Sequence, residues 1–243
     1  MEVFMLKKRY LIVGGLFFLI AVITTGTQSD VKYQWKLDSN KNGCQVYTST
    51  VPGKEYIASK CVCVVPAKME VVGMVIRDIQ GYNQWMADCT ATKMLKVVND
   101  QKDVFLFWFQ QHVPILTDRD MILKSNVILN YPQGWCYIAA SSTKEASYDA
   151  GRGYVRMPSF SCEFLLEWVD RENTRVTFTI NPDLGKGVPV GVANSTIKGI
   201  PYKSLEGMKR MVKLNKYTEC AKTSKYNKMI TDAIRAGHPK IQK

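Results

Sequence analysis

The sequence is poor in histidine, with only His112 and His238 among its 243 residues. Neither histidine lies at metal-ligand spacing from a cysteine, and Cys61-x-Cys63 has no second cysteine pair. Because a structural zinc site needs four sulfur or nitrogen ligands, these absences argue against one. We therefore expect no bound metal and no cofactor.

Motifs that carry catalysis are also missing. The sequence has neither a glycine-rich phosphate loop nor the nucleophile elbow of hydrolases. His112 lies near Pro114 at a predicted strand end, without a carboxylate or serine that the sequence assigns to it. General acid–base chemistry needs such a partner. We therefore expect no catalytic residues and a protein that is not an enzyme.

The N-terminus lacks an apolar run of the ~20 residues that a membrane-spanning helix needs. Its run covers 14 residues, Tyr10–Ile23, with Lys7-Lys8-Arg9 before it and small or polar residues after it at 24–27. This layout is typical of a secretory signal peptide. We assign residues 1–28 to a cleaved signal peptide, with an uncleaved N-terminal anchor as the alternative. The remainder is then exported: periplasmic in a Gram-negative bacterium, and otherwise secreted or anchored.

Positive charge concentrates at the C-terminal end of the chain. The net charge is +12: residues 1–28 carry 3 Lys and Arg against 1 acidic residue, residues 29–202 carry 19 against 17, and residues 203–243 carry 11 against 3. A nucleic-acid binder spreads basic residues through its recognition element, so we expect no nucleic acid. The basic end favours transient docking on an anionic membrane, or it only keeps the protein soluble. The candidate docking residues are Lys203, Lys209, Arg210 and Lys213.

Seven cysteines permit disulfides in an exported protein, with at least one thiol left over. Two β-rich runs, 43–51 and 55–65, meet at Pro52-Gly53 and predict a hairpin. If that turn sets the register, Cys44 and Cys61 lie roughly opposite each other. Cys44–Cys61 is therefore one candidate disulfide, and Cys136–Cys162 is another.

Hydrophobic periodicity predicts one helix and then a run of antiparallel strands. A helix is expected at 68–78, because its apolar residues share one side. Residues 30–37 are interpreted as the end of a short helix, and the strongly apolar 104–111 as a strand buried on both faces. Strands are expected at 92–98, 104–111, 120–130, 135–141, 154–157, 161–169 and 174–180.

The final predicted element is an amphipathic helix that begins at Pro201, a residue suited to a first helical position. Its apolar stripe consists of Tyr202, Leu205, Met208, Met211 and Val212. A sheet of alternating strands needs a cover for its apolar face, and this helix is the expected cover. The fold class is therefore α+β: a curved antiparallel β-sheet wrapped around a long C-terminal α-helix, with room for a ligand between them.

The order and spacing of these elements resemble the START (StAR-related lipid transfer) domain family, within the Bet v 1-like helix-grip superfamily. The motifs that carry the resemblance are Trp35-Lys36-Leu37, Gly43-Cys44-Gln45-Val46-Tyr47, Val64-Val65-Pro66, Tyr82-Asn83-Gln84-Trp85, Thr117-Asp118-Arg119-Asp120, Gly153-Tyr154-Val155-Arg156, Thr174-Arg175-Val176-Thr177, Asn181-Pro182-Asp183 and Gly187-Val188-Pro189. The resemblance, as to an exported bacterial member, implies a START-like domain at 29–216 and a basic extension of the last helix at 217–243. It also implies an internal hydrophobic tunnel, one bound lipid, a monomer and no covalent chemistry.

One position departs from the family pattern. Some sterol-carrying members place an arginine, paired with an acidic residue, inside the tunnel on the strand after the Thr-x-Arg-Asp turn. The aligned position here is Ser125, which faces inward by alternation, whereas Lys124 points the other way. The resemblance therefore implies a smaller polar anchor at Ser125 and leaves specificity for sterols open.

The inward faces of the strands and of the last helix supply the candidate lipid-binding residues. Ser125, Tyr137 and Arg156 are candidates for a polar end that orients one hydroxyl or headgroup. The apolar candidates are Phe107, Met121, Leu123, Val127, Phe164, Phe178, Leu205, Met208, Met211 and Val212. For any single apolar candidate an ordinary core role is the better explanation, whereas Arg156 is equally well explained as a surface or strand-end ion pair.

Three functions are open at this point. The one we favour is non-enzymatic binding and transfer of a lipid, such as a sterol or phospholipid, in a tunnel gated by the C-terminal helix and adjoining loops. The second is a helix-grip enzyme of cyclase or hydrolase type that acts on a hydrophobic substrate. The third is a membrane-docked interaction module with a filled core and no ligand.

Overall fold

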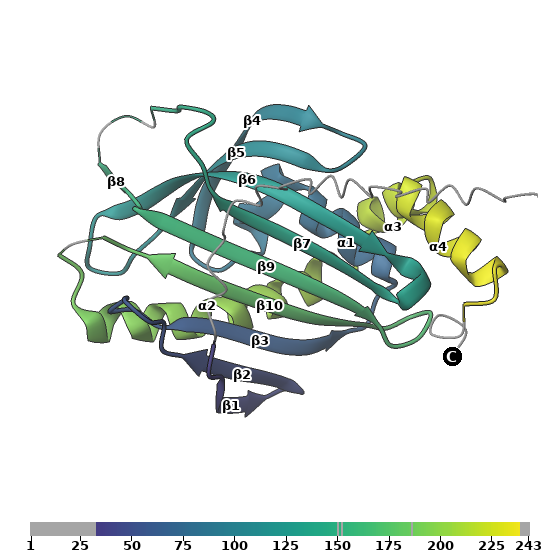
Figure 1. Ribbon diagram of the computed structural model, residues 1–243, viewed down its shortest axis with the longest axis horizontal. Coiled ribbons are helices and arrows are strands. Elements are labelled where there is room, and N and C mark those ends of the chain that lie inside the picture. Colours follow the sequence, from purple (N-terminus) through teal and green to yellow (C-terminus); the bar gives the residue numbers. More distant parts are fainter. Residues whose placement is uncertain (1–32, 150, 152, 186, 239–243) are drawn as a thin grey trace, which may run out of the picture. The chain divides into compact units, whose positions relative to one another are not determined.

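The computed structural model describes residues 33–149, 151, 153–185 and 187–238. Within them, ten strands form one sheet in the order β1-β2-β3-β10-β9-β7-β6-β5-β4, in which all neighbours are antiparallel and β8 pairs parallel with β6 (Figure 1). The strands are β1 (Lys36–Lys41), β2 (Cys44–Ser49), β3 (Ala58–Val65), β4 (Cys89–Asn99), β5 (Val104–Gln111), β6 (Asp118–Asn130), β7 (Trp135–Ser142), β8 (Tyr154–Arg156), β9 (Ser159–Trp168) and β10 (Thr174–Asp183).

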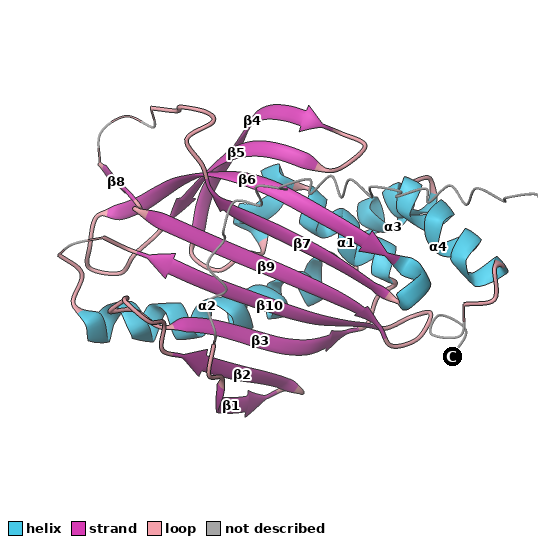
Figure 2. Cartoon of the chain, in the orientation of Figure 1, coloured by secondary structure: helices cyan, strands magenta, loops and turns pink. Residues whose placement is uncertain are grey.

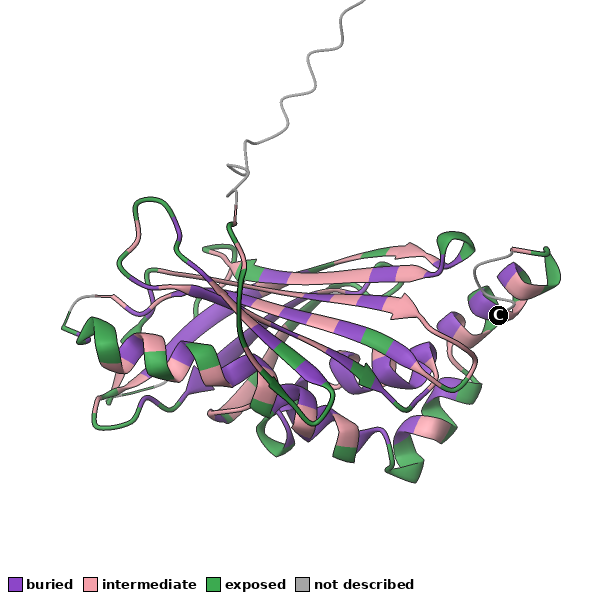
Figure 3. Cartoon of the chain, turned by 90° about the horizontal axis from the view of Figure 1, so that it is seen from below, coloured by how far each residue is buried: buried purple, intermediate pink, exposed green. Residues whose placement is uncertain are grey.

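Helices cover one face of this sheet, as Figures 2 and 3 show. The long helix α2 (Val190–Met211) lies along β2, β3 and β10, while the 3-10 helix η1 (Ile79–Gln84) packs beside β4. The remaining helices are α1 (Met69–Arg77), η2 (Tyr131–Gln133), α3 (Asn215–Lys222) and α4 (Lys225–Arg235). Both α3 and α4 contact α1. The predicted α+β class, with an antiparallel sheet around a long helix near the C-terminus, is confirmed.

Strand β5 is buried on both faces, as its unbroken apolar sequence predicts. Phe107 lies on the inner face, under the helices. On the outer face the loop after β7 brings Tyr148 to Trp108, with ring centroids 5.0 Å apart. The indole Nε1 of Trp108 donates a hydrogen bond of 2.8 Å to Asp120. A loop and a carboxylate therefore cover the side of β5 that the helices leave open.

Residues 36–41 form a strand, so the prediction of a helix end at 30–37 is wrong for its described part. Strand β1 pairs with β2 across Asn42-Gly43, whose φ angles are 49° and 73°. Both angles lie in the left-handed region that a two-residue type I′ hairpin turn requires, and Asn-Gly is the strongest short signal for such a turn. This signal was present in the sequence, and reading 30–37 as helical missed it.

The prediction that Pro201 begins the last helix is wrong, because α2 starts at Val190 and Pro201 lies in its interior. A proline inside a helix lacks one backbone hydrogen bond and costs ~3 kcal/mol. Ala193 and Ile197, ahead of the proline, are buried, as are Leu205 and Met208 behind it. Packing along the whole helix therefore outweighs the local penalty.

The predicted extension of the last helix at 217–243 is instead two separate helices over its described part. Helix α2 ends at Met211, and α3 and α4 follow after short breaks. Ser224 begins α4, because its hydroxyl accepts a hydrogen bond of 3.2 Å from the Asn227 backbone N–H. Each break changes the chain direction, so that α3 and α4 return to α1 and do not continue along the sheet (Figure 1).

Glycine fixes the position of α2 against η1. A Cβ atom added at Gly207 would overlap the backbone carbonyl oxygen of Trp85. Only glycine permits so close an approach of two backbones. Next to this contact, the Ser204 hydroxyl accepts a hydrogen bond of 3.0 Å from the Ala87 backbone N–H. The C-terminal part of α2 is therefore held close to the segment that follows η1.

The structure contains one disulfide among the described residues, and it joins Cys44 to Cys63. The register of β2 and β3 sets Val46 opposite Cys61 and therefore Cys44 opposite Cys63. The predicted Cys44–Cys61 bond is wrong because the hairpin is centred between Gly53 and Lys54, one residue later than a turn at Pro52-Gly53, which moves the partner of Cys44 from Cys61 to Cys63. The alternative pair, Cys136 and Cys162, is also wrong, since both thiols are unbonded.

The predicted signal peptide or anchor at 1–28 lies outside the described residues. Among the helices that the structure does describe, none is both long enough and apolar enough to cross a membrane.

Candidate ligand cavity

An apolar cavity of about 60 Å³ lies between the sheet and helix α1. Strands β5, β6, β7 and β9 form its floor, α1 and η1 form its roof, and Tyr226 of α4 closes one end. The lining includes Met69, Gly73, Ile76, Arg77, Ile79, Tyr82, Asp103, Phe105, Phe107, Phe109, Leu123, Ser125, Val127, Leu129, Cys136, Ile138, Ala140, Phe160, Cys162, Phe164, Leu166 and Tyr226. Except for Ala139, which lies between Ile138 and Ala140, the strand residues of the lining alternate along each strand, as one face of a sheet requires.

Five of the predicted ligand-binding residues line this cavity. They are Phe107, Leu123, Ser125, Val127 and Phe164. Met121 and Phe178 are fully buried but belong to the solid core beyond the cavity, where the Phe178 ring stacks on Phe164 at 4.1 Å. The alternation of the strands thus identified the correct face of the sheet, but not how far the cavity extends along it.

The residues predicted from the last helix do not line the cavity. Leu205, Met208, Met211 and Val212 are buried in the core, on the part of the helix layer that covers β2, β3 and β10. The roof comes instead from α1, through Met69, Gly73, Ile76 and Arg77. These positions follow the i, i+4, i+7, i+8 spacing of one helix face. The helix that lines the cavity is therefore α1 and not α2, which the sequence predicted.

Two of the predicted polar anchors lie away from the cavity. The Arg156 guanidinium pairs with the Asp120 carboxylate through hydrogen bonds of 2.8 and 2.7 Å. Burial alone raises the pKa of Asp120, but hydrogen bonds from Arg156 and Trp108 outweigh it and hold the pKa below its ordinary value. Tyr137 lies next to Glu163, and burial together with that carboxylate raises the pKa of its phenol. Neither Arg156 nor Tyr137 lines the cavity, so neither is its polar end.

The third predicted anchor, Ser125, lines the cavity, but its hydroxyl is already engaged. It accepts a hydrogen bond of 2.8 Å from the Phe105 backbone N–H and donates one of 2.7 Å to the Asp103 carbonyl. Lys124 points outward and pairs with Glu145 at 2.7 Å. Ser125 therefore holds the turn before β5 in place and offers a ligand little beyond its second lone pair.

The polar end of the cavity is built by residues that the sequence analysis did not single out. Arg77 Nε donates a hydrogen bond of 2.9 Å to Asp103 Oδ1, and Lys225 Nζ lies 2.9 Å from Asp103 Oδ2. Asp103 is only 3% exposed and has a positive φ of 54°, which aspartate tolerates better than most residues. Burial and the Asp103 carboxylate raise the pKa of the adjacent Tyr226. One buried carboxylate thus organises two cations and a phenol at the cavity end.

A sequence signal for this end was weak. Asp103 lies in a polar turn between two strands, where an aspartate is usually solvated. Arg77 occupies the last turn of α1, a common place for a surface cation. Tyr226 belongs to a basic segment whose folding back onto α1 no local pattern predicts. The three meet only in the tertiary structure.

For the alternative function as an enzyme, the structure shows one histidine–carboxylate pair, and this pair lies outside the cavity. His112 Nδ1 lies 2.8 Å from Asp118 Oδ1, so the histidine has a carboxylate partner that the sequence did not assign. The His112 side chain is 53% exposed, and neither residue lines the cavity. This pair lies at the start of β6, outside the apolar space in which a hydrophobic substrate would be held.

The predicted membrane-docking residues divide into two groups. Lys203, Arg210 and Lys213 are exposed on or just after α2. Lys209 is half-buried and pairs with Glu206 at 2.8 Å. Three of the four are therefore available to an anionic surface.

Residues 28–218 match the family model described as the START domain. An uncharacterized protein of Pseudomonas aeruginosa is 24% identical over 175 residues, which covers 72% of this chain and 85% of that protein. The STAR-related lipid transfer protein (fragment 25-204) from Xanthomonas axonopodis has a TM-score of 0.66 at 21% identity, covering 74% of this chain and 99% of that chain. Human STARD10 has a TM-score of 0.64 at 18% identity, covering 86% of this chain and 83% of that chain. At these identities the solved structures show the fold. Helix α4 lies beyond residues 28–218, which the family model matches.

Proposed function

Because the chain belongs to the START domain family, we propose that it binds one lipid in the cavity under α1 and transfers it between membranes without covalent chemistry. The observation that carries this proposal is the cavity itself: its lining is apolar except at the Arg77–Asp103 end. A largely apolar pocket with a few polar groups at one place is the usual form of a ligand site.

The polar end favours a lipid with one compact polar group, such as a hydroxyl. Arg77 and Lys225 are both paired with Asp103, so a phosphate would have to compete with a buried carboxylate for them. A hydroxyl can instead donate to Asp103 or accept from Tyr226 without breaking an ion pair. The rest of the molecule would lie along the aromatic and aliphatic lining.

Uptake of a lipid requires the roof to move. Ligand pockets usually have volumes of ~300–1,000 Å³, and this cavity has about 60 Å³. Helix α4 is the element best placed to move, since Tyr226 closes the cavity end and Lys225 anchors the helix to Asp103. In this proposal α4 swings away at a membrane surface, and the lipid enters between α1 and the sheet.

We also propose that this takes place in an exported protein that docks transiently on anionic membranes. The basic and apolar N-terminal run supports export, as does the Cys44–Cys63 disulfide, which oxidising compartments permit. The exposed cations Lys203, Arg210 and Lys213 support docking, at about 1 kcal/mol each near an anionic surface.

Two substitutions of one glycine test the proposed ligand site. Gly73 lies on the cavity face of α1, and no atom lies within 4 Å of the position that its Cβ would take. Gly73→Ala and Gly73→Leu should both gain about 1 kcal/mol of helix propensity, but only the leucine fills the cavity. Lipids extracted from the purified full-length protein are identified by mass spectrometry.

We expect lipid from the wild type and from Gly73→Ala, and at least a tenfold loss in Gly73→Leu. Lipid that adheres to the apolar N-terminal run would persist in all three proteins. Equal recovery from the leucine variant, or none from the wild type, would contradict the proposal.

A further inference from the structure

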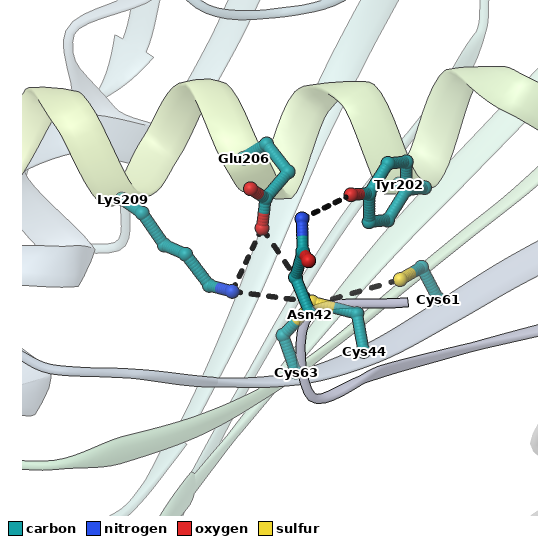
Figure 4. The surroundings of a disulfide bond; sticks show 7 residues. All are labelled: Asn42, Cys44, Cys61, Cys63, Tyr202, Glu206 and Lys209. Atoms are coloured by element: carbon teal, nitrogen blue, oxygen red, sulfur yellow. Dashed lines mark hydrogen bonds and ion pairs between the residues drawn. A yellow bond between two sulfur atoms is a disulfide. The ribbon is translucent and has the colours of Figure 1, made fainter. Parts of the chain in front are cut away.

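Three cysteine sulfur atoms gather under α2, away from the lipid cavity. Cys44 on β2 and Cys61 and Cys63 on β3 are at most 1% exposed, and their Sγ atoms all lie within 4.8 Å of one another. Cys44 and Cys63 form the disulfide, and Cys61 Sγ lies 3.7 Å from Cys63 Sγ (Figure 4). The fold thus places one free thiol directly beside a disulfide.

Helix α2 adds two charged side chains to this cluster. Glu206 Oε1 lies 3.7 Å from Cys44 Sγ, and Lys209 Nζ lies 3.2 Å from the same sulfur and 2.8 Å from Glu206 Oε1. Both side chains are largely covered, with exposed fractions of 30% and 21%. A disulfide is uncharged and needs no charged side chains around it. A carboxylate oxygen is a metal ligand, however, and an ammonium offsets the charge of thiolates.

The distances suit a tetrahedral ion with sulfur ligands. Zn–S bonds of ≈ 2.3 Å in a tetrahedron separate the sulfur atoms by ~3.8 Å, and Cys61 and Cys63 already have this spacing. The Cα atoms of Cys44 and Cys63 are 4.5 Å apart, so rotation of the two side chains can bring a reduced pair to the same separation.

We propose that reduced Cys44, Cys61 and Cys63 bind one thiophilic d¹⁰ ion, with Zn²⁺ as the type case, and that Glu206 supplies a fourth ligand through oxygen. A dithiol reductant opens the site: it gives two electrons and two protons to the Cys44–Cys63 bond and becomes a disulfide itself. The ion then releases the protons of the three thiols to solvent. The oxidised protein has a single thiol here and no such site.

The spacing of ligands along the sequence argues against a metal site, but the fold brings ligands together from distant segments. Cys61-x-Cys63 has no second pair and no histidine nearby along the chain. The third sulfur comes from the neighbouring strand through the β2–β3 register, and the oxygen comes from a helix more than 140 residues later. Spacing along one segment does not detect ligands that meet in this way.

Zinc titration of the full-length protein tests the proposal. The protein is reduced with dithiothreitol, freed of reductant under argon and titrated with Zn²⁺ against a chromophoric chelator. We expect one equivalent more zinc on the reduced protein than on the oxidised protein. X-ray absorption at the zinc edge should show three sulfur atoms at about 2.3 Å and one oxygen at about 2.0–2.2 Å.

Variants identify the ligands. Cys61→Ser should abolish the extra equivalent yet still form the Cys44–Cys63 disulfide when oxidised, which reports that it folds. Glu206→Gln should weaken zinc binding by at least about tenfold, while Cys220→Ser, which changes an exposed cysteine outside the cluster, should bind zinc as the wild type does. The proposal is overturned if reduction adds no zinc, if Cys61→Ser binds normally, or if the reduced protein loses its circular dichroism without binding zinc.

Discussion

The ion pair between Lys225 and Asp103 gives the sharpest test of α4 as the element that opens the cavity. Lys225 Nζ lies 2.9 Å from Asp103 Oδ2 and donates hydrogen bonds of 3.0 and 2.7 Å to the carbonyls of Asp100 and Gln101. Lys225→Met keeps most of the side-chain length and removes all three contacts. Asp103 keeps its partner Arg77, so the variant leaves no buried charge without a counterion.

The expected effect of Lys225→Met on the opening of α4 depends on how far the Lys225 side chain is buried. Hydrogen bonds to charged groups contribute ~1.5–3 kcal/mol, but the Lys225 side chain is 28% exposed, and solvent screening reduces its share. A loss of ~1–2 kcal/mol in the free energy that keeps α4 closed remains. That loss raises the open population by roughly 5–30-fold. The rate of lipid uptake should rise by the same factor if opening of α4 limits it.

Transfer of a fluorescent lipid from neutral phosphatidylcholine vesicles measures this rate, and neutral vesicles keep charge attraction out of the comparison. Lys228→Met is the matched control: it lies on the same helix, and its 78% exposed side chain pairs only with Asp232. Amide hydrogen exchange in α4 reports the opening directly. An unchanged rate in Lys225→Met, or an equal rise in Lys228→Met, would refute this role of α4.

Three further predictions concern the scaffold. Gly207→Ala should destabilise the protein by about 1–3 kcal/mol in urea unfolding because its methyl group meets a backbone carbonyl, whereas Gly199→Ala, in the same helix beside a flexible lysine, should be neutral or stabilising; equal effects would refute the close approach. Arg156→Met should lower stability near neutral pH. Because the pKa of Asp120 is depressed in the folded state, the pair stabilises above the unfolded carboxyl pKa, and the difference from wild type should vanish as pH falls through the folded pKa; a pH-independent difference would contradict this. Thiol titration of the denatured, unreduced protein should find five thiols, of which Cys220 alone reacts readily in the native state.

The sheet could be predicted from sequence because strand alternation is a local property. The pattern at 120–130 placed Leu123, Ser125 and Val127 on one face, and all three line the cavity. The apolar run 104–111 matches β5 residue for residue. In 120–130 the period of the side chains indicates which face is buried, and in 104–111 the unbroken apolar run indicates a strand buried on both faces.

The periodicity does not predict what packs against the apolar face of each helix. The stripe Leu205–Met208–Met211 shows that α2 must be buried, and it is, but the stripe does not say whether a cavity or a solid core lies beneath it. Gly73 of α1 carries no hydrophobic signal at all, yet it lines the roof. A short helix with one glycine toward the sheet leaves space there, and that space depends on packing.

The number of buried residues in each helix explains why α4, and not α2, is expected to open the cavity. Helix α2 buries nine residues and is fixed at Gly207, whereas α4 buries three: Tyr226, Ile230 and Ala233. A large apolar side chain contributes ~1.5–3 kcal/mol when it is buried, so lifting α2 would cost several times more than lifting α4. The ion pair between Lys225 and Asp103 adds to the free energy needed to lift α4. It lies at the polar end of the cavity, so a ligand hydroxyl that reaches Asp103 would act on the same carboxylate that holds α4 closed.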